Sequence, residues 1–128
     1  MIQKNTLLTV VDNSGAKTAS CIHVGKGFKR RYAGLGDIIL VSIKSLRNKR
    51  RATSKVLKGN ICKALVVRCR YKTNHLSRSE EIKLLENSVV LLNLQNKFLF
   101  TRIFGPVPNF IRYTKFMKII SMSSGLLQ

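Results

Sequence analysis

The stretch TLLTVVDNSGAKTASCIHV, from Thr6 to Val24, decides the fold class. Its first part, Thr6–Val11, is apolar and rich in β-branched residues, and it stops at Asp12–Gly15, a cluster of turn-forming residues. From Thr18 to Val24 the side chains fall into two sets with a period of two, which indicates a strand. The stretch therefore predicts two short strands joined by a turn.

Similar runs follow along the chain. We expect further strands at Ile38–Lys44, Ile61–Arg70, Ile82–Leu85 and Val89–Leu92, separated by segments rich in Gly, Asn and charged residues. No internal repeat or low-complexity segment interrupts them. Several short strands bounded by such turns indicate a small antiparallel barrel, because closure leaves no unpaired strand edge.

The last quarter of the chain has a different pattern. Pro106 suits the first position of a helix over Val107–Arg112, and the apolar stripe in Phe116–Ile120 is compatible with one further helical turn. We expect a single domain over residues 1–128. Residues 1–100 would form the barrel, with a basic ribbon or loop at residues 44–58, and residues 101–128 would form loops and short helices.

The charge balance points to an anionic partner. Lys and Arg number 24 against 5 Asp and Glu, so 128 residues carry a net charge of +19. Like charges at this density repel each other unless a polyanion neutralises them. The hydrophobic fraction of 45% excludes a disordered basic tail. A folded nucleic-acid-binding domain is the leading interpretation, because cations that displace counterions from phosphates gain affinity.

The positive charge is unevenly distributed. Fifteen Lys and Arg residues lie between Lys26 and Lys72, where the only acid is Asp37. We expect this segregation to make one end of the barrel electropositive. Solvated lysines without a target are the simpler alternative. Nearly half of these cations are Arg, whose planar guanidinium binds phosphate through two hydrogen bonds, and this favours phosphate binding.

Aromatic residues accompany the basic cluster Lys29–Arg31. Phe28 and Tyr32 flank it, and Tyr71 follows Arg70. Rings beside cations can stack on unpaired bases. We expect Phe28 in the core, whereas packing on the barrel and contact with RNA are equally open for Tyr32. Shape and backbone contacts to folded RNA are the expected mode, since no code for base recognition is visible.

Cysteine and histidine do not form a metal-binding pattern. Cys21, Cys62 and Cys69 lack CxxC spacing, and His23 and His75 complete no ligand set. The apolar context of each Cys predicts buried, reduced thiols and a reducing compartment. We expect neither a metal nor a cofactor.

The sequence also matches enzymes and membrane proteins poorly. Glu80 and Glu81 would point to opposite faces of a strand, Ser14 lacks the context of a nucleophile elbow, and Gly25–Gly27 is not a P-loop. No apolar run approaches the roughly 18 residues that span a bilayer. The N-terminus shows no secretory or transit pattern. We expect no catalysis and no membrane contact.

Five motifs in register carry a family resemblance. They are Asp12–Lys17 with Cys21-Ile22, Arg30–Ile39, Lys63–Arg68, Thr101–Val107 and Phe116–Ser121. Over nearly the whole chain, their order and spacing resemble the family of universal large-subunit ribosomal protein fourteen. The resemblance implies a mainly β fold, a small five-stranded β-barrel with a protruding β-ribbon and short C-terminal helices.

The resemblance also implies a function. Members are structural components of the large ribosomal subunit that bind its rRNA and bridge to small-subunit rRNA, beside the large-subunit protein numbered nineteen. A ribosome-silencing factor docks on the same face and blocks subunit joining. A free RNA-binding β-barrel outside the ribosome is the alternative.

The candidate site residues form two sets. Within the rRNA-binding set, the resemblance assigns Arg30, Arg31, Lys44, Arg68 and Arg70 by motif. The whole rRNA-binding set is Asn13, Lys17, Lys26, Lys29, Arg30, Arg31, Tyr32, Lys44, Arg47, Lys49, Arg50, Arg51, Lys55, Lys58, Arg68, Arg70 and Lys72. The surface expected to face the other subunit or the silencing factor comprises Thr101, Arg102 and Lys118, matched by motif, with Arg112 and Lys115.

The chain also departs from the family pattern. Arg47–Lys55 is longer than the family's usual loop. Phe100 replaces a usual Gly, and Pro108 and Phe110 replace small or polar residues, so we expect added apolar groups on the surface. We expect a mitochondrial, organelle-encoded protein, with a plastid or a bacterial cytoplasm as alternatives. The reasons are these departures from the family pattern, the Asn- and Lys-rich sequence and the absence of a presequence.

Overall fold

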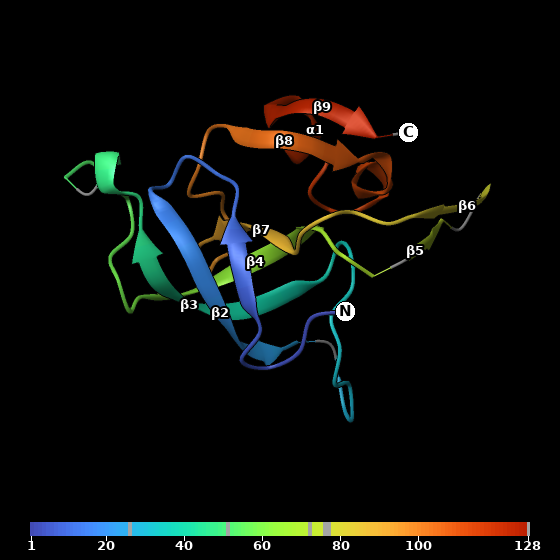
Figure 1. Cartoon of the computed structure of the whole chain (residues 1–128), viewed down its shortest axis with the longest axis horizontal. Coiled ribbons are helices and arrows are strands. Elements are labelled where there is room, and N and C mark those ends of the chain that lie inside the picture. Colours follow the sequence, from blue (N-terminus) through green and yellow to red (C-terminus); the bar gives the residue numbers. More distant parts are fainter. Residues whose placement is uncertain (26, 51, 72, 76–77, 128) are drawn as a thin grey trace.

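The main body is a closed barrel of five strands in the order β1-β2-β3-β4-β7 (Figure 1). The computed structural model describes residues 1–25, 27–50, 52–71, 73–75 and 78–127, with the backbone alone at 50, 73–75 and 78–82. The barrel strands are β1 Leu7–Val10, β2 Ala16–Val24, β3 Ile38–Leu46, β4 Ile61–Arg68 and β7 Ser88–Leu92. The predicted mainly β fold with a five-stranded barrel is confirmed.

Backbone pairing runs around the whole barrel. Consecutive neighbours from β1 to β7 pair antiparallel, and the parallel pair of β1 and β7, with Thr9 opposite Ser88, closes it. Closure leaves none of these five strands with an open edge, which keeps a chain of high β-propensity from pairing with other chains.

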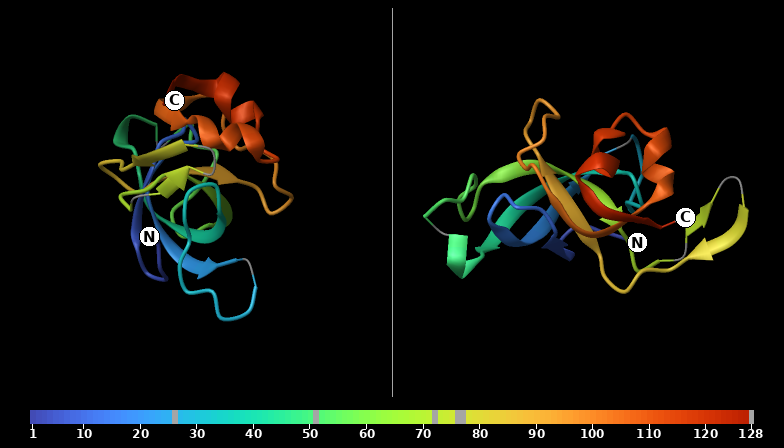
Figure 2. Two further views of the ribbon diagram at one scale, coloured as in Figure 1. Left: turned by 90° about the vertical axis from the view of Figure 1, so that its right-hand side faces the viewer. Right: turned by 90° about the horizontal axis from the view of Figure 1, so that it is seen from above.

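A two-stranded ribbon leaves the barrel between β4 and β7. It pairs β5, Thr73–His75, with β6, Arg78–Ile82, and it extends away from the barrel (Figure 2). The strand expected at Ile82–Leu85 is wrong, because pairing ends at Ile82. Beyond it, the Leu84 N–H donates to the Cys69 carbonyl at 3.3 Å and draws the chain back to the end of β4.

Beyond the end of β3, the described part of residues 44–58 forms a loop and no ribbon. β3 continues to Leu46, and the 3-10 helix η1, Asn48–Arg50, opens the connection to β4. The Lys55 N–H donates to the Ser14 carbonyl at 2.9 Å, so the loop folds back on the β1–β2 turn. Of the two forms expected here, the loop is the one found.

β4 and β7 are buried on both faces. One set of alternating side chains packs inside the barrel: Ala64, Val66, Val89 and Leu91. The other set packs outside it: Leu65, Val67, Val90 and Leu92. Continuous apolar runs are typical of strands covered on both sides. An outer face this apolar needs a cover, because leaving it in water forfeits about 25 cal/mol for each Å².

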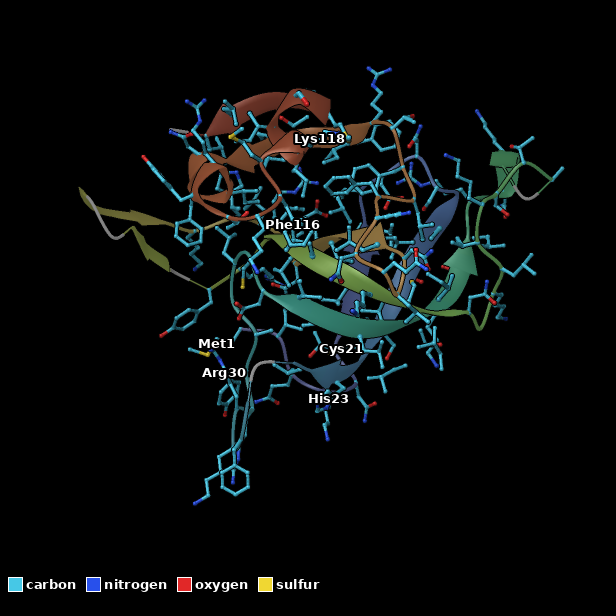
Figure 3. All side chains as sticks on the ribbon, turned by 180° about the vertical axis from the view of Figure 1, so that it is seen from behind. Met1, Cys21, His23, Arg30, Phe116 and Lys118 are labelled. Carbon is cyan, nitrogen blue, oxygen red and sulfur yellow. The ribbon has the colours of Figure 1, made fainter. Side chains whose placement is uncertain are left out.

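The C-terminal segment is that cover. It contains β8 Ile103–Pro108, η2 Asn109–Tyr113, α1 Lys118–Met122 and β9 Ser123–Leu127, and β8 pairs in parallel with β9. Its buried side chains lie on the outer face of β4 and β7: Ile103, Val107, Ile111 and Ile119. Phe116 lies between this layer and the barrel, and its ring meets Phe98 edge-on with centroids 6.0 Å apart (Figure 3). We call residues 101–127 the C-terminal layer.

The helix expected over Val107–Arg112 begins two residues later than predicted, as the 3-10 helix η2. Pro106 and Pro108 lie in the strand β8, and Pro108 is extended with φ −62° and ψ 140°. A proline also disfavours the helical region for the residue before it, here Val107, so a helix cannot begin until Asn109. The expected short helices are present, but they are η2 and α1.

Of the three departures expected to add apolar groups to the surface, two are buried and one is half-buried. Phe100 is buried and meets Phe98 with ring centroids 5.3 Å apart, while Pro108 is buried in β8. Phe110 is half-buried and lies against Gly36. The expectation of added surface apolar groups is therefore wrong for Phe100 and Pro108. These side chains enlarge the contact between the C-terminal layer and the barrel.

Asp12 is a buried carboxylate in the turn after β1. Its Oδ1 accepts the backbone N–H of Ser14 at 3.0 Å and also the Ser14 hydroxyl, and its Oδ2 accepts the Leu91 N–H at 2.8 Å. The side chain therefore ties the turn to β7. Such hydrogen bonds offset part of the cost of burying a charge.

The three thiols are buried and unpaired, as expected. Cys21 and Cys62 pack in the barrel core, and Cys69 follows β4. Burial, with a smaller contribution from the negative charge of Asp12, raises the pKa of Cys62 to about 11. Burial also raises the pKa of Cys21. Thiols held protonated in this way are poor nucleophiles.

Two features are absent from the described part of the chain. No group of three or more His, Cys, Asp and Glu side chains is placed to hold a metal ion there. No helix in those residues is long and apolar enough to cross a membrane.

Replacing Asp12 with Asn tests the buried carboxylate. Whichever way the amide is turned, one backbone N–H, of Ser14 or Leu91, faces its NH2 group and loses a buried acceptor. We expect the free energy of unfolding, measured by urea denaturation at pH 7, to fall by about 1–3 kcal/mol. Ser14→Ala should cost less, because Asp12 Oδ1 keeps the Ser14 N–H. Equal losses in the two variants would contradict this role.

The stability difference between wild type and Asp12→Asn should also depend on pH. Burial raises the pKa of Asp12 above its ordinary value of 3.8, and its hydrogen bonds and the charge of Arg47 offset this only in part. The native state therefore binds the proton more tightly than the unfolded chain, and stability falls as pH rises above 3.8. We expect the variant to be more strongly destabilised at pH 4 than at pH 7 in the same urea titrations.

Candidate RNA-binding surfaces

The exposed cations gather at two opposite ends of the barrel. β3 runs from the loop of residues 25–37, the β2–β3 loop, to the loop of residues 47–60, the β3–β4 loop (Figure 1). Because a strand joins them, these basic segments are adjacent in sequence but separated in space. The expectation of one electropositive end is wrong, and the charge is divided between two.

The β2–β3 loop presents its cations to solvent. Lys29, Arg30 and Arg31 are exposed, and Figure 3 shows Arg30 beneath the barrel near Met1. Asp37, buried at the base of the loop, accepts the Gly34 N–H at 3.0 Å and pairs with Arg30 at 3.6 Å. The Arg30 side chain remains 49% exposed, and Lys29 and Arg31 are exposed beside it, so this end still presents positive charge to a partner.

The aromatic residues of this end are on the surface. Phe28 is 92% exposed, so its expected place in the core is wrong. Tyr32 is 43% exposed and Tyr71 is 52% exposed. Both Tyr side chains line one shallow hollow together with Arg30 and Arg31. Tyr32 therefore packs at the edge of the barrel and still offers part of its ring to a partner.

The other end of the barrel holds a hollow lined by three lysines. Lys17, Lys44 and Lys58 surround about 430 Å³ together with Ser45 and Asn48. They come from β2, β3 and the β3–β4 loop, so the barrel itself brings them together. No acidic side chain is among the described residues that line the hollow. Three ammonium groups with hydroxyl and amide donors suit a phosphate group.

Asn13 is used inside the protein. Its Oδ1 accepts the backbone N–H groups of Thr101 at 2.9 Å and Arg102 at 3.3 Å, and its Nδ2 donates to Thr101 Oγ1 at 2.8 Å. Asn13 and Thr101 were expected to face different partners, yet they bind each other. They join the β1–β2 turn to the start of the C-terminal layer.

Arg68 is also an internal connection. Its side chain is 10% exposed and pairs with Glu86 at 3.1 Å. Its Nη2 donates to the Phe104 carbonyl at 3.1 Å, and its Nη1 donates to the Pro106 carbonyl at 3.3 Å. A buried guanidinium bound to β8 is not placed for rRNA, so the expected contact is not supported for Arg68.

Arg47, expected to bind rRNA, makes contacts within the protein. Its Nη2 donates to the Val10 carbonyl at 2.9 Å, and its guanidinium lies 5.0 Å from the ring centroid of Phe104. It is half-buried and connects the β3–β4 loop with β1 and β8. Its first role is therefore to hold these segments together.

The remaining members of the rRNA-binding set are exposed or undescribed. Lys49, Lys55 and Arg70 are exposed. Lys26, Arg51 and Lys72, and the side chain of Arg50, lie outside the described residues.

The outer side of the C-terminal layer carries a sparser positive surface. Arg102, Arg112, Lys115 and Lys118 are exposed, as expected. Two apolar side chains between them are also open to water, Tyr113 at 78% and Met117 at 63%. Sequence reasoning missed this mixed character, because Met117 was counted only as part of an apolar stripe compatible with a helical turn.

Comparison with known families agrees with this architecture. Residues 1–127 match the model of the family described as ribosomal protein L14p/L23e. The chain belongs to this family. L14p/L23e proteins are structural components of the large ribosomal subunit, a role that is structural rather than enzymatic.

The internal roles of Asn13 and Arg68 were missed for a physical reason. Nothing in the local sequence distinguishes a buried arginine from a phosphate-binding one. The sequence does hold one indirect signal, which is the glycine at position 105. In the structure this residue follows Phe104 and has a positive φ of +84°. A side chain there would overlap the Arg68 guanidinium, so this member of the L14p/L23e family needs glycine at position 105 to admit Arg68.

Gly105→Ala tests the Arg68 connection. A methyl group would meet Nη1 of Arg68, and a positive φ is strained for Ala. We expect the free energy of unfolding to fall by about 2–4 kcal/mol, because the backbone is strained and hydrogen bonds to a charged group are broken.

Gly125→Ala is the matched control. Gly125 lies in β9, and a methyl group there meets no atom within 4 Å. We expect a change within about 0.5 kcal/mol in the same urea titration. If Gly105→Ala were as mild as Gly125→Ala, Arg68 would not hold the C-terminal layer.

Proposed function

We propose that this L14p/L23e protein binds large-subunit rRNA through both ends of its barrel. The observation that carries the proposal is the division of its exposed cations into two groups. One group is Lys29, Arg30 and Arg31 in the β2–β3 loop, and the other is Lys17, Lys44 and Lys58 around the hollow at the far end. A rigid barrel with a basic cluster at each end can hold two RNA segments at a set separation.

The mode of contact follows from the chemistry of these groups. Ammonium and guanidinium groups bind phosphate oxygens and leave the base edges of a helix unread. A-form RNA is recognised largely by shape and backbone. The protein therefore neutralises and positions rRNA, which accounts for a net charge of +19.

The outer side of the C-terminal layer has a separate part in the proposal. It faces the small subunit, contributes to bridges with small-subunit rRNA, adjoins the large-subunit protein numbered nineteen and receives a ribosome-silencing factor. Its support here is its mixed character, since exposed Tyr113 and Met117 stand among sparse cations such as Arg112 and Lys118. Such a surface suits a protein as well as RNA. We place the protein in the mitochondrial ribosome, on the sequence drift described above.

Two double substitutions that remove positive charge test the two ends of the barrel. Arg30→Gln with Arg31→Gln, and Lys44→Gln with Lys58→Gln, each remove two exposed cations. We expect each pair to weaken binding to a large-subunit rRNA transcript and to make the log–log salt slope shallower by about 0.7–0.9 for each phosphate that is no longer bound. Filter binding over a range of salt concentrations measures both effects.

Lys115→Gln with Lys118→Gln is the charge-matched control. It removes the same charge from the C-terminal layer and should leave the slope for isolated large-subunit rRNA unchanged. If all three pairs acted equally, or if unrelated RNA bound as well as rRNA, the alternative of a free RNA-binding barrel outside the ribosome would be favoured.

Arg102→Glu and Lys118→Glu test the C-terminal layer. Both side chains are exposed, so reversing their charge should leave the fold intact. We expect each variant to bind the silencing factor at least several-fold more weakly, because a desolvated like-charge contact costs a few kcal/mol. Binding of purified silencing factor to large subunits carrying each variant measures this.

Arg31→Glu serves as the control, since it reverses an exposed charge at the far side of the barrel. It should impair rRNA binding and spare the affinity for the silencing factor. Unchanged affinity in both Arg102→Glu and Lys118→Glu would refute the docking surface.

A further inference from the structure

Phe28 is held in water at the tip of the β2–β3 loop. At 92% exposure it is the most exposed aromatic side chain among the described residues. A ring of this size normally gains from burial, so its position calls for a partner that covers it.

The backbone imposes this exposure. Gly27 and Lys29, on either side of Phe28, have positive φ of 93° and 63°, and this tight turn aims the ring outward. The base of the loop is fixed, because Ile2 and Ala33 exchange backbone hydrogen bonds at 3.0 and 2.8 Å. Phe28 is thus presented on an anchored loop.

The surroundings of the ring are strongly basic. Lys29 Nζ lies 5.5 Å from the Phe28 ring centroid. A surface groove of about 930 Å³ runs beside Phe28, and its described lining includes Lys4, Lys29, Arg30 and Arg31 but no acidic side chain. An apolar pocket on a protein would have to remove water from these cations without compensation. A strand of RNA offers a flat π-face for the ring and phosphates for the cations.

We propose that Phe28 stacks on an unpaired nucleobase while Lys29, Arg30 and Arg31 hold the phosphates of the same strand. This inference rests on the proposed function and adds to it a base contact that the phosphate-binding surfaces lack. The contact tolerates any base, since every base has a π-face.

A tryptophan reporter tests the stack directly. The chain has no Trp, so Phe28→Trp places a single indole at the tip of the loop. The probes are single-stranded oligoadenylate, which has bases, and inorganic polyphosphate, which has charge alone. We expect oligoadenylate to quench the fluorescence at saturation and polyphosphate to leave it unchanged. Leu85→Trp, at a position that is 94% exposed and outside the proposed binding surfaces, should respond to neither probe.

Affinity measurements separate aromatic stacking from apolar contact. Phe28→Ala and Phe28→Leu should weaken oligoadenylate binding about 5- to 100-fold, whereas Phe28→Tyr should retain it. The salt slope and the affinity for polyphosphate should not change, because the cations remain. Leu85→Ala should match wild type.

Several results would overturn the stack. They are equal quenching by the two probes, wild-type affinity in Phe28→Leu, or an equal loss of polyphosphate binding in Phe28→Ala. Wild-type affinity in Phe28→Leu would assign Phe28 a general apolar contact in place of aromatic stacking. Failure of the proposed function is a separate result: it would appear as no preference for rRNA, with the base-dependent quenching of Phe28→Trp intact.

Discussion

The whole fold depends on the short turn between β1 and β2. Asp12 binds the Leu91 N–H of β7 from inside this turn, and Asn13 binds the backbone of Thr101 and Arg102 at the start of the C-terminal layer. The carbonyls of Ser14 and Gly15 accept N–H groups from the β3–β4 loop. Because a buried polar group is costly without a partner, each of these bonds fixes the element at its other end. One four-residue segment therefore holds the barrel, its long loop and its C-terminal layer in register.

A second constraint follows from the small size of the barrel. β4 and β7 are apolar on both faces, so the barrel is complete only when the C-terminal layer covers its outer side. That layer lies flat on the barrel because Arg68 binds two of its carbonyls and Phe98, Phe100 and Phe116 pack between the two bodies. Phe100 and Pro108 are buried, and Phe110 is half-buried against Gly36.

The arrangement accounts for how the positive charge can be used. Two arginines, Arg47 and Arg68, hold the C-terminal layer through bonds to Val10, Phe104, Pro106 and Glu86. The exposed cations are then placed by the ends of the strands, at two separated sites and on the outer side of the layer. A rigid body that carries separated basic groups is suited to a fixed place in a large RNA assembly, the setting of L14p/L23e proteins.

The five barrel strands, the buried thiols and the basic character could be predicted from the sequence alone, because period-two alternation, turn residues and charge are local properties. The sequence did not determine where β8 and the helices begin, since the pairing of β8 with β9 outweighed the helical preference expected after Pro106. Only the tertiary structure decided which cations face solvent: Arg30 and Arg68 look alike in sequence, but one lies on a loop and the other beneath Gly105. The same holds for Phe28, which a tight turn exposes, and Phe100, which the C-terminal layer buries. Burial depends on what packs against a residue from elsewhere in the chain, and that information is absent from its neighbours in sequence.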